Sequence, residues 1–314
     1  MLPEQLQQFA DTPLKVLNDG HVLLVDVMGD EQAIIDAARV SFGKGTKRVL
    51  EDRGLIRYLM RHYHTTPLEM CELKIRIRIP MDAWRQMVRH RTANINEYST
   101  RYSEAIDSMA DTDDDAWRLQ STDNKQGSKG YLSEWPGTFE SIDVDTEVET
   151  PGEYLSSKEE EFHRVARELY EERLSLGIAK EQARKDLPLS TYTEAYWKCD
   201  LHNLLNFLRL RLAPDAQLEI RLYAQAMAEI VKVWVPMVWE AFMDYTMQSM
   251  KLSRMESVGI AALLQDYQLL AMPGNYSTDN LKLLQTAVEA AGLKGREADE
   301  FTAKLRLLMM MGVS

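Results

Sequence analysis

The stretch that decides the fold is Leu73–Pro80, whose sequence is Leu-Lys-Ile-Arg-Ile-Arg-Ile-Pro. Apolar and basic side chains alternate strictly along it, which is typical of a half-buried β-strand with one apolar face and one charged face. Pro80 ends this strand and can open a helix, because its fixed backbone angle suits the first helical position. We therefore expect a strand over 73–80 that is followed directly by a helix over 81–91.

Upstream of this strand the chain alternates between one further strand and two helices. The run Val-Leu-Leu-Val-Asp-Val at 22–27 predicts a buried strand, and Gly29 and Asp30 stop it. Helix-spaced apolar residues follow over 31–40 and 51–62. The Gly-Lys-Gly-Thr-Lys turn between these helices, at 43–47, lacks the spacing of a phosphate-binding P-loop, so we interpret it as a flexible turn.

Downstream, an acidic segment separates the strand from a long helical region. Residues 103–155 are rich in Asp, Ser, Thr and Gly and predict a long loop or insertion. A capping box at Ser156–Glu159 then predicts a helix start. The pattern over 191–250 is helical, with a break near Pro214 and a kink at Pro236, and 257–312 forms a further helical tail.

Together these patterns predict an α+β fold that is mostly helical, with a small, central, largely antiparallel sheet. We expect a catalytic domain over residues 1–250, including the acidic insertion at about 103–155, and a C-terminal helical extension over 251–314.

Charge is distributed unevenly along the chain. The 314 residues carry 37 basic and 49 acidic side chains, a formal net charge of −12. Residues 103–162 hold 17 acidic and 4 basic side chains, whereas residues 71–102 hold 7 basic and 3 acidic ones. A basic stretch in an acidic protein favours a small anionic ligand, because most of the remaining surface would repel the backbone of a nucleic acid.

Candidate chemical groups are densest over Arg89–Tyr102, with the sequence Arg-His-Arg-Thr-Ala-Asn-Ile-Asn-Glu-Tyr-Ser-Thr-Arg-Tyr. Arg89, His90 and Arg91 supply donors suited to phosphate or carboxylate. A solvated basic helix end is the alternative interpretation. The polar side chains that continue to Arg101 favour a binding site, because loops rich in directional hydrogen-bonding groups commonly carry function.

This segment resembles the signature of the flavin-dependent thymidylate synthases, in which Arg-His-Arg is followed after seven residues by Ser99. Four further blocks of that family appear in the same order, from about Val22 to Met250 apart from the acidic insertion. They are Ala37–Phe42, His64–Glu69, the pair Arg85-Gln86, and Leu204–Arg211 followed by Ala216-Gln217.

The resemblance implies an enzyme that makes dTMP by reductive methylation of dUMP. It implies FAD as cofactor, NADPH as reductant, 5,10-methylenetetrahydrofolate as carbon donor, and a homotetramer with sites between subunits. Arg211 and Ser99 resemble catalytic residues. The residues that resemble dUMP contacts are Gln86, Met87, Val88, Arg89, Glu97, Tyr98, Ser99, Thr100, Arg101, Arg184 and Arg211. Those that resemble FAD contacts are Ser41, His64, Thr66, Arg89, His90, Arg91, Asn96, Glu97, Asp200, Leu201, His202 and Asn206.

Side-chain chemistry agrees with these implied roles. There is no G-x-G-x-x-G sequence, so phosphate groups would be bound by side chains rather than by a Rossmann turn. A guanidinium at Arg211 could stabilise negative charge on the uracil ring without giving up a proton. We expect Cys71 to point inward, and neither Cys71 nor Cys199 has a cluster of cations that would make it a thiolate nucleophile.

Several alternatives remain open from the sequence. A related enzyme could hydroxymethylate or methylate a uracil nucleotide on the same scaffold, or the chain could be an inactive flavin- or nucleotide-binding regulator. Metal binding by His62 and His64 is disfavoured because no third ligand completes a set. Two cysteines, no signal peptide and no long apolar stretch favour a cytoplasmic protein that acts without a membrane or a nucleic acid.

Overall fold

The computed structural model describes residues 2–40, 52–122, 124–135, 150–270, 280–294 and 296–311. The chain divides into two compact units, Met1–Met247 and Gln248–Ser314, which are described separately below. The expected turn at 43–47 and the candidate residue Ser41 lie outside the described residues.

An antiparallel sheet lies at the centre of the first unit. Its strands are β1 (Leu14–Val16), β2 (Gly20–Met28), β3 (Glu72–Pro80), β7 (Tyr192–Asp200) and β4 (Asn94–Glu97), in that order across the sheet. Each neighbouring pair is antiparallel. The expected strands at 22–27 and 73–80 are confirmed, and the fold is α+β, with helices predominating around this small sheet.

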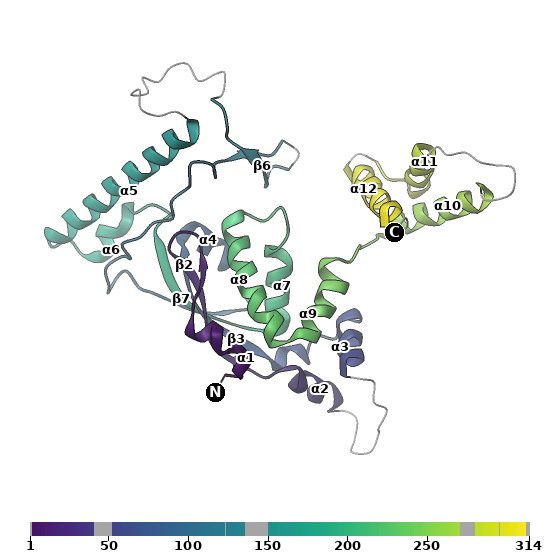
Figure 1. Ribbon diagram of the computed structural model, residues 1–314, viewed down its shortest axis with the longest axis horizontal. Coiled ribbons are helices and arrows are strands. Elements are labelled where there is room, and N and C mark those ends of the chain that lie inside the picture. Colours follow the sequence, from purple (N-terminus) through teal and green to yellow (C-terminus); the bar gives the residue numbers. More distant parts are fainter. Residues whose placement is uncertain are drawn as a thin grey trace. The chain divides into compact units, whose positions relative to one another are not determined.

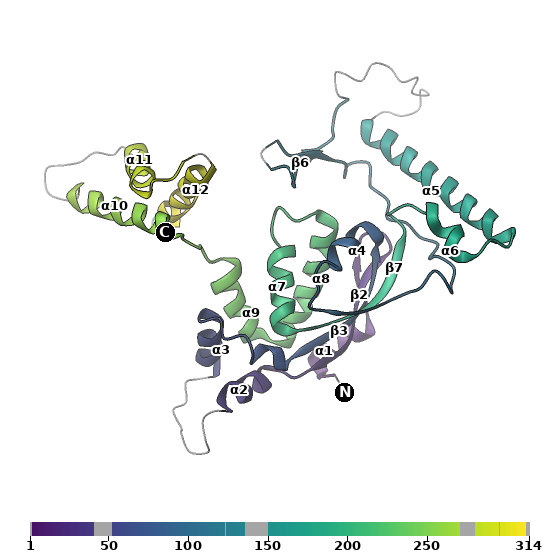
Figure 2. The ribbon, with the colours of Figure 1, turned by 180° about the vertical axis from the view of Figure 1, so that it is seen from behind.

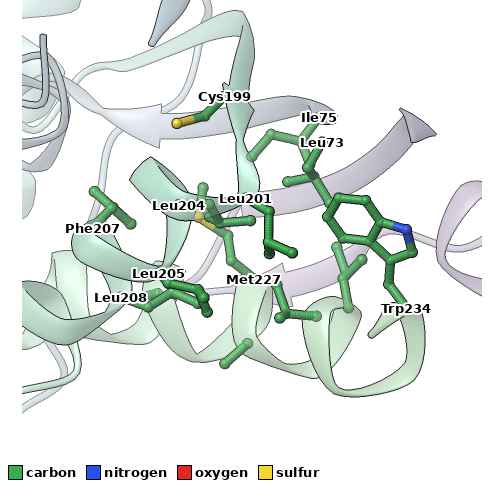
Figure 3. Close-up of a cluster of buried hydrophobic side chains, with 14 of the residues drawn as sticks. Leu73, Ile75, Cys199, Leu201, Leu204, Leu205, Phe207, Leu208, Met227 and Trp234 are labelled. Carbon is green, nitrogen blue, oxygen red and sulfur yellow. The ribbon is translucent and has the colours of Figure 1, made fainter. Parts of the chain in front are cut away.

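The alternation in β3 decides which face of the sheet is buried. Leu73, Ile75, Ile77 and Ile79 are fully buried, whereas the basic side chains between them are only partly covered. Helices α4 (Met81–Met87), α7 (Leu201–Arg211) and α8 (Leu218–Trp234) pack on the apolar face (Figures 1 and 2). Figure 3 shows this cluster, in which leucines of α7 meet β3 and the Trp234 side chain. The sheet and these helices therefore share one hydrophobic core.

Shorter helices complete the first unit. Helix α1 (Glu4–Asp11) packs against α8, and α2 (Glu31–Arg39) and α3 (Asp52–Arg61) confirm the helices expected upstream of the central strand. A 3₁₀ turn, η1 (Leu68–Met70), precedes β3, and α9 (Pro236–Phe242) is followed by a π-helical turn at Met243–Met247. The chain breaks between α7 and α8 near Pro214, as expected, and Pro236 begins α9 rather than kinking a continuous helix.

Strand β7 corrects the expectation that the chain is helical from residue 191. Residues 192–200 pair with β3 along their whole length, from Tyr192 opposite Pro80 to Asp200 opposite Glu72. Ala195, Trp197 and Cys199 are buried, while the residues between them are half-buried or exposed. Asp200 caps α7 by accepting a hydrogen bond from the Asn203 N–H at 2.9 Å. Strand and helix join without a turn, so the helical pattern of α7 obscured the alternation before it.

The described part of the acidic insertion contains more secondary structure than the sequence predicted. It contains a two-stranded hairpin, β5 (Arg118–Gln120) with β6 (Ser128–Tyr131). Helix α5 (Pro151–Ser175) begins before the predicted Ser156–Glu159 capping box. That prediction is wrong, since the observed box joins Thr150 and Glu153. The short helix α6 (Lys180–Ala183) and the 3₁₀ turn η2 (Arg184–Asp186) follow α5.

A chain of hydrogen bonds attaches the start of the insertion to the body of the first unit. The His163 ring on α5 lies between Asp111 and Ser190, with Nδ1 3.0 Å from Asp111 Oδ1 and Nε2 2.8 Å from Ser190 Oγ. Asn18 Nδ2 donates to the other oxygen of Asp111 at 2.9 Å. The His163 side chain is buried while Asp111 is exposed, and these contacts join four segments that are distant in the sequence.

The second unit contains α10 (Arg254–Leu270), α11 (Asn280–Ala291) and α12 (Arg296–Met311). Its described core comprises Leu284, Ala287, Ala291, Phe301 and Leu305. Gly292 follows the end of α11 with φ +65°, a conformation that glycine adopts without strain. Within the described residues, no helix has the length and apolar character needed to cross a membrane.

Candidate active site

The junction of β3 and α4 places the start of the signature segment. Pro80 stands at the N-cap of α4, and the helix ends at Met87, earlier than expected, so Arg89–Arg91 follow the helix instead of lying on it. Trp84 and Met87 are buried in the core. Any ligand contact by Met87 is thus limited to its backbone. Gln86 and Val88 are half-buried, and Val88 packs against the same core.

A hydrogen-bonded network connects Gln86 to Arg211. Arg211 Nη2, at the end of α7, donates to the Gln86 carbonyl oxygen at 3.1 Å. The Gln86 amide donates to Gln217 Oε1, and Gln217 Nε2 donates to Asp82 Oδ2 at 3.0 Å. Burial, reinforced by the nearby negative charge of Glu219, raises the pKa of Asp82. Four side chains from three helical segments thus form one polar group.

Arg211 is the member of this network with unused hydrogen-bonding capacity. Its side chain is half-buried, and burial lowers its pKa. Within the described residues, the Gln86 carbonyl is the one acceptor that meets its guanidinium. A partly desolvated guanidinium with spare N–H donors is suited to an anionic or carbonyl-bearing ligand.

The second group of candidates is a turn packed against α6 and η2. Tyr102 and Ser103 donate backbone N–H groups to the Ser99 carbonyl, at 3.2 and 3.1 Å. Arg184 donates to Thr100 Oγ1, and Arg101 Nε donates to Glu181 Oε2 at 3.0 Å. Ser99 and Arg184 are half-buried, while Arg101 is exposed. Thus Thr100 and Arg101 lie on one turn, which contacts α6 through Glu181 and η2 through Arg184.

His90 faces the core rather than solvent. Its Nε2 lies 3.0 Å from Thr92 Oγ1 and 3.8 Å from Cys199 Sγ, and its ring contacts Trp197 and Phe207. Burial lowers the pKa of His90, and the nearby Arg211 guanidinium lowers it further. The middle residue of the signature therefore packs beside the start of α7 and close to Arg211. These contacts attach the segment to the core.

Unlike the buried His90, the neighbouring arginines of this segment reach solvent. Arg85, Arg89 and Arg91 are all exposed. Among the described residues, none accepts a hydrogen bond or forms an ion pair with these three guanidinium groups. Most other arginines of the first unit are paired with carboxylates. Uncompensated cations in an acidic chain fit the pyrophosphate of a flavin dinucleotide.

The remaining flavin candidates lie on β4, on α7 and near η1. Asn96 and Glu97 are exposed on the edge strand β4, where Glu97 Oε1 accepts from Thr193 Oγ1 at 2.9 Å, and Tyr98 follows them. His64 and Thr66 are exposed before η1. The rings of His62 and His64 lie 4.3 and 5.7 Å from that of Tyr58.

Candidates at the start of α7 are partly engaged within the chain. Both Asp200 oxygens accept hydrogen bonds from Asn203. The Leu201 side chain is fully buried and its N–H donates to the Cys71 carbonyl at 2.8 Å, so no side-chain contact with flavin is open to Leu201 here. His202 is half-buried, and Asn206 accepts from Arg209 at 2.9 Å. Of this group, His202 and Asn206 remain the accessible candidates.

Both cysteines are buried, which agrees with the inward orientation expected for Cys71. Burial raises the pKa of the Cys71 thiol to about 12 and raises that of Cys199 as well. Thiols held neutral in this way are poor nucleophiles. Among the described residues, no group of three or more His, Cys, Asp or Glu side chains is placed to hold a metal ion.

The sequence patterns did not predict the part that Gln217, Asp82 and Glu219 have in the polar group around Gln86. Their signal is weak, because one polar residue at the start of a helix usually serves as a cap. The contacts of Gln217 with Gln86 and Asp82 exist only in the folded chain.

Known proteins share both the sequence and the fold. The family model described as "Thymidylate synthase complementing protein" matches residues 23–237. A flavin-dependent thymidylate synthase of Thermus thermophilus is 47% identical over 251 residues, which are 80% of this chain and 86% of that protein. Its counterpart in Rickettsia conorii is 46% identical over 253 residues, 79% of this chain and 84% of the relative.

A solved structure agrees with these matches. The UMP/dUMP methylase PolB from Streptomyces cacaoi, bound with 5-Br UMP, superimposes with a TM-score of 0.61 at 31% identity, covering 74% of this chain and 97% of PolB. The family match includes strands β3, β4 and β7 of the central sheet, the signature segment and Arg211. The chain therefore belongs to the flavin-dependent thymidylate synthases.

Proposed function

We propose that the protein is an FAD-dependent thymidylate synthase that methylates dUMP to dTMP, with 5,10-methylenetetrahydrofolate as carbon donor and NADPH as reductant. The observation that carries this proposal is the position of Arg211. Its half-buried guanidinium is held beside Gln86 and keeps hydrogen-bond donors unused within the described residues. Family membership supplies the reaction class, and this geometry supports a site for the uracil ring.

Each group of candidates takes one part of the nucleotide. We assign the uracil ring to Arg211 and Gln86, because an arginine fork and an amide match its carbonyl and N–H edge. Negative charge that develops on the ring would be stabilised by Arg211 without proton transfer. We assign the phosphate to Ser99, Arg101 and Arg184, which share one turn and its support.

The flavin would be held mainly by side chains outside this nucleotide group. Arg89 and Arg91 lack partners within the described residues and fit the pyrophosphate, and the exposed β4 strand offers Asn96 and Glu97. When bound, the flavin supplies the hydride that completes the methyl group. The chain's own residues orient the ligands, while His90 holds the signature segment against the core.

We further propose a homotetramer with sites between subunits, located in the cytoplasm. Three exposed apolar side chains lie beside the flavin candidates on the edge of the sheet: Ile95, Tyr98 and Tyr196. Their exposure supports an interface in which a second subunit covers this edge. The two buried free cysteines are compatible with a reducing compartment.

UMP is the second candidate substrate, because the structural relative PolB is described as a UMP/dUMP methylase. Hydroxymethylation in place of methylation is the other variation of the reaction. Both alternatives would use the same uracil and phosphate contacts and differ from the main proposal in the product.

The visible spectrum and the product mass test these proposals. The purified protein should show flavin absorption at roughly 450 nm. Incubation with dUMP, the folate and NADPH should give a product heavier by CH₂, whereas hydroxymethylation would add CH₂O. A protein that stays colourless with added FAD would exclude the main proposal, and faster turnover of UMP than of dUMP would replace the substrate.

A further inference from the structure

The acidic insertion makes one charged contact with the body of the first unit close to Gln217. Arg118, the first residue of β5, donates from Nη2 to Glu219 Oε1 in the first turn of α8. The two side chains are 25% and 21% exposed, so this ion pair is largely withdrawn from solvent. Exposed pairs contribute little, but removing one partner of a covered pair leaves an uncompensated charge.

Arg118 is held in place from the insertion side. The neighbouring Trp117 donates its indole N–H to Ser156 Oγ on α5 at 3.0 Å, and Ser156 Oγ donates to the Thr112 carbonyl at 2.8 Å. The Trp117 carbonyl accepts from the Leu132 N–H at 2.8 Å, which attaches the other side of the hairpin. Helix α5 and the hairpin therefore fix the backbone from which Arg118 extends.

Glu219 leads directly into the candidate nucleotide network. It stands two positions after Gln217, the N-cap residue of α8, whose amide bonds Gln86 and Asp82. The charge of Glu219 contributes to the raised pKa of Asp82, after burial as the larger cause. Glu219 Oε2 is buried and has no hydrogen-bond partner within the described residues. Without a cation, the Glu219 carboxylate would be covered and would face a second acid.

We infer that Arg118 is a positioning residue for the uracil-nucleotide site, acting through Glu219 and Gln217 on Gln86. The inference rests on the proposed function, because it takes Gln86 and Arg211 as the uracil contacts. The positive charge of Arg118 compensates the negative charge of Glu219 and so keeps the first turn of α8 in place. Gln217, in that turn, then holds the Gln86 side chain. The insertion thereby becomes part of the substrate site without touching the substrate.

Replacing Arg118 by Ala tests the inference. We expect the dUMP KM and the dUMP Kd to rise about tenfold, which corresponds to about 1.4 kcal/mol. The turnover number kcat and the flavin spectrum should change little, because Arg118 contacts neither Arg211 nor any candidate flavin residue that the structure describes. Arg118→Lys, which retains the positive charge, should restore most of the affinity. A matched control is Arg164→Ala, which removes an exposed ion pair with Glu168 at 2.7 Å on α5.

The second variant distinguishes positioning from a general loss of structure. Glu219→Gln removes the buried charge, so the double variant Arg118→Ala/Glu219→Gln should bind dUMP more tightly than Arg118→Ala alone. If Arg118→Ala is insoluble, this double variant and Glu219→Gln carry the comparison, and affinity close to that of the wild type in both supports the inference.

The outcomes separate the inference from the proposed function. A wild-type protein that binds no dUMP would overturn both. A wild-type protein that binds and turns over dUMP, with Arg118→Ala indistinguishable from Arg164→Ala, would overturn the inference alone. Equal loss of affinity in Arg118→Ala and in the double variant would show that Arg118 does not act through the charge of Glu219.

Discussion

At the scale of single residues, Arg211 offers a fixed arrangement of N–H donors in addition to its positive charge. The guanidinium is planar and half-buried, and one of its N–H groups is committed to the Gln86 carbonyl at 3.1 Å. Lysine at this position would keep the charge and lose the fixed fork of donors. The contact to Gln86 and a contact to the uracil ring could then not be made together.

We therefore expect Arg211→Lys to fold and bind flavin normally while kcat falls by about 10²–10³, or about 3–4 kcal/mol in transition-state stabilisation. Steady-state kinetics with dUMP would measure this. Arg221→Lys is the control, because Arg221 also donates to a backbone carbonyl, that of Pro214 at 2.7 Å, but lies outside the candidate site. Near-normal turnover in Arg211→Lys would show that the uracil ring binds elsewhere.

His90 makes stability depend on pH. Its pKa is lowered in the folded chain, chiefly by burial, so the unfolded chain binds the proton more readily. Stability is fully present above the unfolded pKa of about 6.5 and falls as the pH drops towards the lower folded value. The slope reaches about 1.4 kcal/mol per pH unit for one proton. His21, whose pKa is also lowered by burial, acts in the same direction.

Urea unfolding between pH 7.5 and 5 should show that His90→Gln loses less stability per pH unit than the wild type. The reason is that the variant has one histidine fewer that takes up a proton on unfolding. The His21 contribution should remain. His62→Gln, which changes an exposed histidine, should keep the wild-type slope. An unchanged slope in His90→Gln would mean that the pKa of His90 is the same in the folded and the unfolded chain.

At the scale of elements, the outcome of the sequence predictions depended on how local each signal was. Strand β3 was predictable because its alternation is complete within one run of residues. Strand β7 was missed because it passes into α7 at Asp200 without a turn. The candidate ligand residues came from the family resemblance. The contacts that join them, such as Gln217 with Asp82 and Arg118 with Glu219, link residues 135 and 101 positions apart, and no local pattern encodes them.

His163 tests how firmly the insertion is attached. Both of its ring nitrogens are within hydrogen-bond distance of partners, Asp111 before the hairpin and Ser190 before β7. His163→Ala removes two hydrogen bonds of a buried ring, one to the exposed Asp111 and one to the half-buried Ser190, which should cost about 1–3 kcal/mol. Urea unfolding would give the loss of stability, and trypsin should cleave faster after Arg118 and Lys125. Lys158→Ala, on the same helix with an exposed pair to Glu161, should change neither measurement. Unchanged cleavage in His163→Ala would show that the other contacts suffice.

At the scale of the whole molecule, the family match and the compact units divide the chain at similar places. The family model ends at residue 237, and the first unit ends at Met247. The second unit has its own buried side chains around Phe301 and its own helix cap, since Ser253 and Glu256 bond each other's backbone N–H groups at 2.7 and 3.2 Å. These features give each unit the means to fold separately.

A chain that ends at Met247 should therefore fold, bind flavin and keep kcat/KM within about threefold of the full-length protein, less than about 1 kcal/mol. Gly259→Val in the full-length chain provides an independent check. A Cβ at Gly259 would lie 2.3 Å from the Ala287 carbonyl oxygen and 2.7 Å from the Phe301 ring, so valine should separate α10 from its neighbours. This variant should lose the packing of the second unit, seen as faster amide exchange over 254–311, and retain the activity of the shortened chain. A more than tenfold loss of kcat/KM in both proteins would show that residues 248–314 are required for catalysis.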